Sequence, residues 1–496
     1  MTTGKKFVKD SVLSFLLKFI GMAIGFLLQV VLNRYLGNDG YGKYAIFLTI
    51  INIFSLVCVF GIDGSLVRTL ARFEDDDNLR NVLLKRSSVV SISITSIVSI
   101  LLIIFQKYIL DFFALDKVQY LYIIIVVLFI TSLSKILDGY FQGINRTIIS
   151  ILCTNFLANI FKMVIFLVVV TFDKRYLLMS LITFLLTELG LLVVKLYKIY
   201  NINKKQMVVT KESEYTKTQF NTFFRYAFYL STISGVDVIV KSMDKIMLNS
   251  LVNSSEVASY KVAENYLGIV GIFASTFIVF WPIMSRLYEE NKIKELEKNF
   301  NYVTKIITVT SLPVLVFMIT YSSELFAVFG KGYRGSAPVL YILLFGIVID
   351  SLSGPVGALL NMTSYAKYNL IDMIILAVMN FALNVILIPK YGAIGAAIAT
   401  SSSLSLINLI NIVQNKIFLG VFPYDLKNIY LLIGSGVLLF LDKLLYVNIS
   451  LGNTYVNMFV VLIINYIIYT IFFMAISKKE FMYLVNLIKE KRSGKK

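Results

Sequence analysis

The chain has 496 residues, of which 58% are hydrophobic and 15% are charged, and its mean hydropathy is +0.79. A soluble protein carries about 25% charged residues, so this composition excludes a soluble globular protein and indicates a multi-span membrane protein. The formal net charge of +18 does not indicate nucleic-acid binding, because lysine and arginine concentrate in the loops between apolar segments. The chain has no histidine, which excludes histidine-ligated metals and histidine proton relays.

Apolar runs long enough to cross about 30 Å of hydrocarbon recur along the chain. We predict about fourteen membrane-spanning helices, with very short connections after residues 171 and 388. Their expected limits are 11–33, 43–66, 87–106, 119–141, 147–171, 176–197, 224–250, 262–284, 303–322, 337–360, 368–388, 392–415, 427–446 and 455–476. Cys58 and Cys153 fall inside apolar spans and are expected to be free thiols in the core.

The charge distribution predicts that both termini are cytoplasmic. An even number of spans places the two ends on one side of the membrane. With the N-terminus inside, the main basic segments, 67–86, 198–223, 285–302 and the tail from 477, all lie on the cytoplasmic side, as the positive-inside rule requires. The tail is amphipathic and basic, and we expect it to lie on the anionic inner leaflet.

The sequence contains weak echoes of an internal repeat. The segment Leu32–Tyr44 matches Leu248–Tyr260 at three positions with a constant offset, and Asn155–Ile160 is echoed by Asn380–Val385. The echoes keep their order along the chain, which favours a duplication of six spans. Because six is even, the two copies would share one orientation, related by an axis along the membrane normal, with substrate bound between them near the midplane.

We therefore predict an all-α membrane fold with two pseudo-symmetric six-helix lobes and two further C-terminal helices. The expected parts are a first lobe at 1–200, a basic cytoplasmic linker at 201–223, a second lobe at 224–420, two helices at 421–477 and a basic tail at 478–496.

Ionisable side chains inside the spans carry the strongest functional signal, because a charge at the centre of a spanning helix costs about 2.5–3.5 kcal/mol on insertion scales. Residues 229–251 hold four such groups within one third of the helix circumference. The candidate lining of a cationic cavity is Lys18, Lys162, Lys241 and Lys245. The candidate ion-coupling groups or counter-ions are Asp237, Asp244, Glu188 and Asp138.

Several of these charges also have structural interpretations. Lys18 lies close enough to the cytoplasmic end of its span to reach the interface. Lys135 and Asp138 are spaced to pair on one helix, and so are Asp237 and Lys241. Local capping or pairing is likewise expected of two further acids, Asp350 and Asp372.

Lysines around one chamber suit an anionic substrate such as a phosphate, because lysine binds phosphate as a point charge. The acids suit either coupling to H⁺ or Na⁺ or internal charge balance. No Walker A sequence, GxSxG elbow or metal-ligand cluster is present, so we expect no cofactor beyond a possible H⁺ or Na⁺ gradient, and no enzymatic activity.

Three stretches resemble a known family. They are Asn33–Phe47 with Phe60–Arg68, Asp244–Asn265 with Trp281–Glu290, and Phe329–Gly346 with Asn380–Thr400. Together they resemble the polysaccharide transporter family, which includes the repeat-unit flippases of O-antigen and capsule assembly, within the multidrug/oligosaccharidyl-lipid/polysaccharide exporter superfamily. The resemblance covers about residues 5–420, and the motif YGxxGAAxAT near residue 400 is its most specific part.

The resemblance implies a transporter in a prokaryotic cytoplasmic membrane that moves an undecaprenyl-pyrophosphate-linked oligosaccharide to the outer leaflet by alternating access, driven by an ion gradient. Its expected partners are the lipid-linked substrate, membrane lipids and the polymerase and other assembly proteins, and the chain itself is expected to be a monomer. A lipid-II-type flippase and a drug/cation antiporter of the same superfamily remain alternatives. A non-transporting scaffold is disfavoured by the charges inside the spans.

Overall fold

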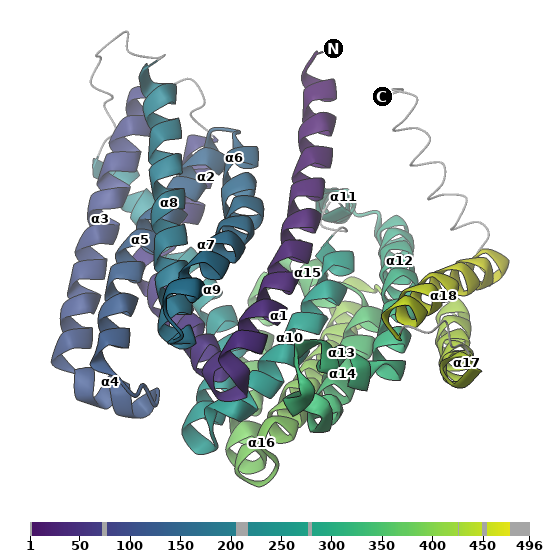
Figure 1. Cartoon of the computed structure of the whole chain (residues 1–496). Helices are drawn as coiled ribbons and strands as arrows, with labels where there is room; N and C mark the ends of the chain where they lie inside the picture. Colours follow the sequence, from purple (N-terminus) through teal and green to yellow (C-terminus); the bar gives the residue numbers. More distant parts are fainter. Residues whose placement is uncertain are drawn as a thin grey trace. The chain divides into compact units, whose positions relative to one another are not determined.

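The computed structural model of the chain is shown in Figure 1. It describes residues 2–71, 77–204, 217–275, 280–424, 426–448 and 454–476. Within these ranges every regular element is a helix and no strand occurs, which confirms the all-α prediction. The chain folds into two compact units, unit 1 at Met1–Ala258 and unit 2 at Ser259–Lys496.

Unit 1 is organised around α5, which packs against α1, α2, α3 and α8. Its elements are α1 (Thr2–Val59), α2 (Ile62–Leu70), α3 (Asp77–Ile104), α4 (Gln106–Phe112), α5 (Val118–Gly143), α6 (Thr147–Ile151), the π-helical turn η1 (Leu152–Leu157), α7 (Ala158–Phe172), α8 (Tyr176–Lys204) and α9 (Lys217–Leu251). The free thiols Cys58 and Cys153 are buried in this unit, as predicted.

Unit 2 is organised around α12 and α16. Helix α12 packs against α14, α17 and α18, and α16 packs against α14 and α15. The elements are α10 (Ser254–Ser275), which begins in unit 1, α11 (Trp281–Glu289), α12 (Ile293–Thr320), α13 (Ser322–Phe329), the 3₁₀ turn η3 (Lys331–Ser336), α14 (Ala337–Ser353), α15 (Val356–Asn361), α16 (Ala366–Leu419), α17 (Leu426–Asn448) and α18 (Thr454–Ile476).

Nine helices of the described residues are long and apolar enough to cross a membrane. Helices satisfy their backbone hydrogen bonds internally, which is the requirement for a chain in hydrocarbon. Two of the nine, α1 and α16, are much longer than one span needs, at 58 and 54 residues. The prediction of fourteen spans with cytoplasmic termini stays a prediction.

The two longest helices fold back on themselves at a glycine. α1 turns at Gly37 (φ 66°) and α16 at Gly392 (φ 54°), where a positive φ favours glycine. The two arms of α16 contact each other, because the Asn380 amide donates to the Thr400 hydroxyl at 3.1 Å. The very short connection predicted after residue 388 is therefore a tight hairpin turn between two antiparallel helices.

Three predicted spans contain interruptions that the apolar patterns did not indicate. The span predicted at 43–66 breaks at Gly61, which has a positive φ of 68°. The span at 337–360 breaks before Pro355, which lacks the backbone N–H that a continuing helix needs. The span that includes Leu152–Leu157 widens there into a π-helical turn, a feature that often occurs at functional sites.

The position of α9 differs from the predicted division of the chain. The predicted limits assign this helix to the second lobe, but in the structure it packs against α1 and α2, and the Ser65 hydroxyl donates to the Phe223 carbonyl at 2.9 Å. Part of the predicted linker, 205–216, lies outside the described residues, and so does the predicted tail at 478–496. The predicted lobe limits stay a prediction.

Helix α1 approaches the π-helical turn so closely that only glycine fits at one position. A Cβ at Gly21 would lie 2.3 Å from the Asn155 carbonyl oxygen. We predict that Gly21→Ala lowers stability by about 1–3 kcal/mol, the usual cost of overpacking. The measurement is the midpoint of thermal unfolding of the purified protein in detergent.

The matched control is Gly190→Ala on α8, where an added Cβ meets nothing within 4 Å. Alanine is the better helix former by about 0.5–1 kcal/mol, so this variant should unfold at the same or a higher temperature. Equal midpoints for the two variants would contradict the close approach of α1 to η1.

Candidate functional site

A polar stripe runs along one face of α5 in unit 1. Thr131, Ser134, Lys135 and Asp138 are spaced i, i+3, i+4 and i+7, which places them on the same side of a helix. In a spanning helix this face must contact other protein groups or a water-filled cavity, because hydrocarbon offers no partners for hydrogen bonds. The stripe therefore marks the polar interior of unit 1.

The carboxylate of Asp138 forms a buried ion pair with α8. Lys195 Nζ lies 2.7 Å from Asp138 Oδ2, and it also donates to the Ser134 hydroxyl at 2.6 Å. The Lys195 side chain is 1% exposed and that of Asp138 is 14% exposed. Losing one partner of such a pair leaves a buried charge without compensation, so the pair fixes α5 against α8.

A second ion pair lies between α7 and α8. Lys162 Nζ lies 3.0 Å from Glu188 Oε1, and both side chains are 16% exposed. The same ammonium sits 4.2 Å from the centre of the Phe184 ring, within cation–π distance. Lys162 has no acid one turn away on its own helix, and its partner comes from the neighbouring helix instead.

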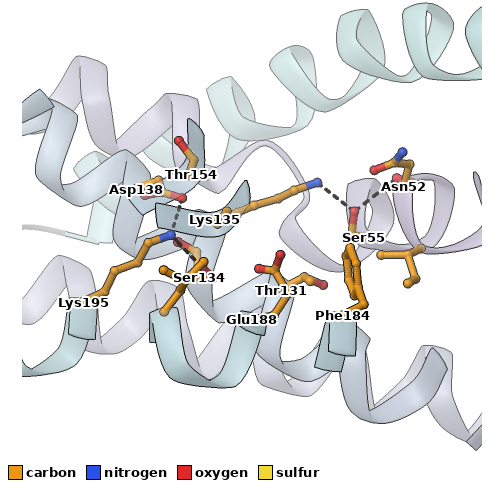
Figure 2. Close-up of a pocket in the computed structure, with 13 residues that line it drawn as sticks. Asn52, Ser55, Thr131, Ser134, Lys135, Asp138, Thr154, Phe184, Glu188 and Lys195 are labelled. Carbon is orange, nitrogen blue, oxygen red and sulfur yellow. Dashed lines mark hydrogen bonds and ion pairs between the residues drawn. The ribbon is translucent and has the colours of Figure 1, made fainter. Parts of the chain in front are cut away.

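Lys135 differs from these two lysines because its bonded partner is neutral. Its ammonium donates to the Ser55 hydroxyl on α1 at 2.7 Å, and Ser55 in turn donates to the Asn52 carbonyl. Figure 2 shows the Lys135 side chain reaching toward Ser55, away from the Asp138–Lys195 pair. Among the described residues no carboxylate forms an ion pair with Lys135. The sequence-based pairing of Lys135 with Asp138 is therefore wrong, because Lys195 takes that carboxylate.

Apart from Lys162, these side chains line an inner cavity of about 190 Å³ between α1, α5, η1, α7 and α8, which we call the chamber (Figure 2). Its wall is made by Ile51, Asn52, Ser55, Thr131, Ser134, Lys135, Asp138, Thr154, Ala158, Phe184, Glu188, Leu191 and Lys195. The π-helical turn brings Thr154 to this wall. The charged groups in the wall are two lysines and two acids, so the cavity is polar but close to neutral.

A second cavity of about 360 Å³ shares Lys135 and Asp138 with the inner one. It lies between α1, α2, α5 and α9, and Asp63, Gln142 and Ser234 add to its polar lining. The shared wall makes Lys135 and Asp138 the residues that face both spaces.

The four charges predicted on α9 occupy two different environments. Lys241 and Asp237 are 68% and 47% exposed and pair with each other at 2.8 Å, which confirms the expected i,i+4 contact. Asp244 and Lys245 are buried and each has an interaction partner. None of the four, and not Lys18, which is exposed on α1, lines either of the two cavities described above.

Lys195 is a chamber residue that the sequence did not lead us to predict. It lies two residues before the end of the span predicted at 176–197 and was not considered among the charges inside the spans. A usable signal was present, because Lys195 follows Glu188 by seven residues and therefore shares its helix face. Of the lysines predicted to line a cavity, Lys162 contacts the wall of the chamber, because it pairs with Glu188.

The chamber has the chemistry of a binding site for a polar solute. Among the described residues no group of three His, Cys, Asp or Glu side chains could hold a metal ion. The chamber offers ammonium groups, hydroxyls and carboxylates within helices of membrane-spanning length.

Comparison with known proteins identifies the family. The model of the polysaccharide biosynthesis protein family matches residues 7–288, and the MatE family model matches residues 234–386. The probable low-salt glycan biosynthesis flippase Agl15 of Haloferax volcanii is 23% identical over 97% of this chain and 99% of its own length. A Shigella flexneri protein named for O-antigen transport is 22% identical over 75% of this chain and 88% of its own.

A solved structure shares the fold. The lipid II flippase MurJ, in an inward closed conformation, superposes with a TM-score of 0.71 at 20% sequence identity, covering 94% of this chain and 99% of that one. With the two family matches, this shared fold places the chain in the multidrug/oligosaccharidyl-lipid/polysaccharide exporter superfamily. The chain is a member of the polysaccharide biosynthesis protein family, and it is a multi-pass protein of a prokaryotic cell membrane.

The Lys195–Asp138 pair generates a stability prediction. Asp138→Asn or Lys195→Met alone should each cost about 3–5 kcal/mol, because each leaves one buried charge without a partner. The double variant should recover much of that loss, since it removes both charges. The measurement is the thermal unfolding midpoint of the four proteins in detergent.

Asp237→Asn is the matched control, since its pair with Lys241 is exposed and worth about 0–1 kcal/mol. Additive losses in the Asp138/Lys195 double variant would show that the two groups do not form a coupled pair.

Proposed function

We propose that the protein is a flippase that moves an undecaprenyl-pyrophosphate-linked oligosaccharide repeat unit from the cytoplasmic to the outer leaflet by alternating access. It is a transporter and not an enzyme, and it spans the membrane about fourteen times with both termini in the cytoplasm. The family membership and the glycan flippases among its relatives support a lipid-linked glycan as substrate.

The single observation that carries the proposal is the charged chamber inside unit 1. A pyrophosphate-linked sugar has no route through hydrocarbon, and a flippase must supply polar partners for its head group. The chamber supplies lysine, hydroxyl and amide groups among helices that are otherwise apolar. The polyprenyl tail needs no such partners and stays in the lipid.

Lys135 is the side chain best suited to receive a phosphate group. Its ammonium is bonded to a neutral hydroxyl, whereas those of Lys195 and Lys162 already pair with carboxylates. An anion at Lys135 replaces the one hydrogen bond that its ammonium donates to Ser55 and leaves the ion pairs intact. Lys18, Lys162, Lys241 and Lys245 stay proposed substrate contacts that lie outside the walls of the two cavities, and Lys135 is added to them as a residue of both walls.

The acids divide between charge balance and possible coupling. Asp138, Glu188 and Asp237 each pair with a lysine, which suits counter-ions, and Asp244 is buried beside Lys245 in the sequence. We propose that transport uses an H⁺ or Na⁺ gradient, with these carboxylates as the groups that respond to it. The lipid-linked substrate, membrane lipids and the polymerase are the proposed partners of a monomeric transporter.

The lysine assignment predicts the outcome of export assays. Lys135→Ala should lower export of lipid-linked glycan about ten- to hundredfold, because it removes a hydrogen bond to a charged group, which contributes about 1.5–3 kcal/mol. Lys162→Ala should also lower export, because it leaves the Glu188 carboxylate beside the chamber without its ion-pair partner. The assay uses cells that lack their own flippase, with the abundance of each variant in the membrane measured in parallel.

Lys107→Ala is the matched control, because Lys107 is exposed on α4 and lines neither cavity. Normal export by the Lys135 and Lys162 variants at normal abundance would remove the chamber from the transport pathway.

The coupling proposal has a separate test in proteoliposomes. Substrate-dependent transport should stop when the H⁺ and Na⁺ gradients are both dissipated, and restoring one of them should identify the driving ion. Transport at an unchanged rate without either gradient would contradict ion coupling while leaving the flippase assignment untouched.

Two alternatives rest on specific observations. A lipid-II-type flippase is favoured by the fold of MurJ, and a drug/cation antiporter by the MatE match over residues 234–386. Complementation of a lipid II flippase defect would support the first, and resistance to cationic drugs without glycan export would support the second.

A further inference from the structure

Two buried carboxyl groups in unit 2 are bonded to amides in the same unusual way. Gln414 Nε2 donates to Asp372 Oδ1 at 2.9 Å, and Asn465 Nδ2 donates to Asp442 Oδ2 at 2.7 Å. Asp372 is 1% exposed and Asp442 is 0% exposed. The first pair joins the two arms of the α16 hairpin, and the second joins α17 to α18.

Each pair leaves two buried oxygens without a donor. They are Asp372 Oδ2 with Gln414 Oε1, and Asp442 Oδ1 with Asn465 Oδ1. A buried acceptor without a partner costs about 1–3 kcal/mol. A carboxyl and a carboxamide satisfy each other fully in a ring of two hydrogen bonds, and the amide supplies one of the two hydrogens. The other must come from a proton on the carboxyl group.

Among the described residues no lysine or arginine forms an ion pair with Asp372, although α16 itself carries Lys367, Lys390 and Lys416. The one interaction of Asp372 among the described residues is with Gln414. Helix α15, which packs against α16, contains no titratable residue, and α14 contains no lysine or arginine. The ionisable groups of α14 are Tyr341 and Asp350, and Asp350 accepts a hydrogen bond from Asn408 instead.

Asp442 is in a similar position. Helix α18 has no charged residue, and its Tyr466 and Tyr469 hydroxyls donate to backbone carbonyls. Tyr321, the residue between α12 and α13, is a titratable group that interacts with Asp442, and in the described part of the chain Asn465 is the hydrogen-bond partner of Asp442. An isolated ionised carboxylate in such a site would cost far more than a hydrogen bond returns, and such a group takes up a proton instead.

We propose that the Asp372–Gln414 and Asp442–Asn465 pairs are two proton-binding sites, each holding one proton as a neutral carboxylic acid. The proton on Asp372 Oδ2 donates to Gln414 Oε1, and the proton on Asp442 Oδ1 donates to Asn465 Oδ1. A metal cation does not fit, because hard cations take about six or more oxygen ligands and each site offers two free oxygens.

The bound protons hold helices together at defined places. Asp372 precedes the Gly392 turn by 20 residues, about 30 Å along the helix, so its pair closes the far end of the α16 hairpin. Removal of the proton leaves a buried carboxylate opposite an amide oxygen, and the two arms then separate or admit water. The stabilisation is therefore present while the carboxyl is protonated and is lost as the pH rises far enough to deprotonate it.

Infrared spectroscopy of the full-length protein in liposomes tests the proposal directly. Asp372→Asn and Asp442→Asn should each remove the carbonyl stretching band of one protonated carboxyl group at neutral pH, and the double variant should lose twice that intensity. Asparagine keeps the shape and supplies the missing hydrogen through its own amide, so these variants should fold. Asp138→Asn is the control, because its ion-paired carboxylate should contribute only to the carboxylate bands.

Loss of carboxylate bands from the Asp372 and Asp442 variants would overturn the proposal, and so would protonated bands that vanish when Na⁺ replaces K⁺ in the buffer.

A pH series of thermal unfolding gives a second readout on the unmodified chain. Its midpoint should fall as pH is raised above neutrality, and the Asp372→Asn/Asp442→Asn double variant should lose less than half as much. An equal fall in both proteins would also contradict the proposal. Neither measurement uses a transported substrate, so their outcome is independent of the proposed flippase activity.

Discussion

The free-energy cost of an unpaired charge inside the membrane governs the arrangement of this protein's polar residues. Each ionisable group within a span costs about 2.5–3.5 kcal/mol on insertion scales unless protein or water compensates it. In unit 1 the compensation comes from neighbouring helices: Lys195 pairs with Asp138, and Lys162 with Glu188. These pairs fix α5 and α7 against α8, and they keep the cavity between the helices polar without a large net charge.

The two units compensate their acids in different ways. Unit 1 places an ammonium group beside Asp138 and Glu188, whereas unit 2 places an amide beside Asp372 and Asp442. An ammonium group stabilises the charged form of a carboxylate. An amide donates one hydrogen bond to a carboxyl group, and the second hydrogen bond, to the amide oxygen, needs a proton on the carboxyl group. Buried acids are thus paired with lysines in the chamber of unit 1, whereas in unit 2 the proposed neutral acids form contacts between helices.

The sequence predicted helices well because the length of an apolar run is a local property. It predicted the Asp237–Lys241 contact on one helix but not the ion pairs of Lys195 and Lys162, because spacing rules describe contacts on one helix and these pairs join two helices. Lys162 has no acid within one turn of its own helix, and its partner Glu188 approaches it from α8. Lys195 and Asp442 were overlooked because each lies in the last third of its predicted span, close to the charged end. The pattern of apolar residues at Leu152–Leu157 does not distinguish this π-helical turn from an ordinary α-helix.

Lys135 is the lysine of the chamber whose hydrogen-bond partner is a neutral hydroxyl. An anion that entered either cavity would meet buried ion pairs, and removing one partner of such a pair costs about 3–5 kcal/mol. It would also meet the Lys135 ammonium, whose hydrogen-bond partner among the described residues is the Ser55 hydroxyl. Exchanging that hydroxyl for a negatively charged oxygen adds the attraction between opposite charges to the hydrogen bond. In the proposed function, the paired Lys195 holds the wall of the chamber together, and Lys135 is the group that receives the negatively charged head group.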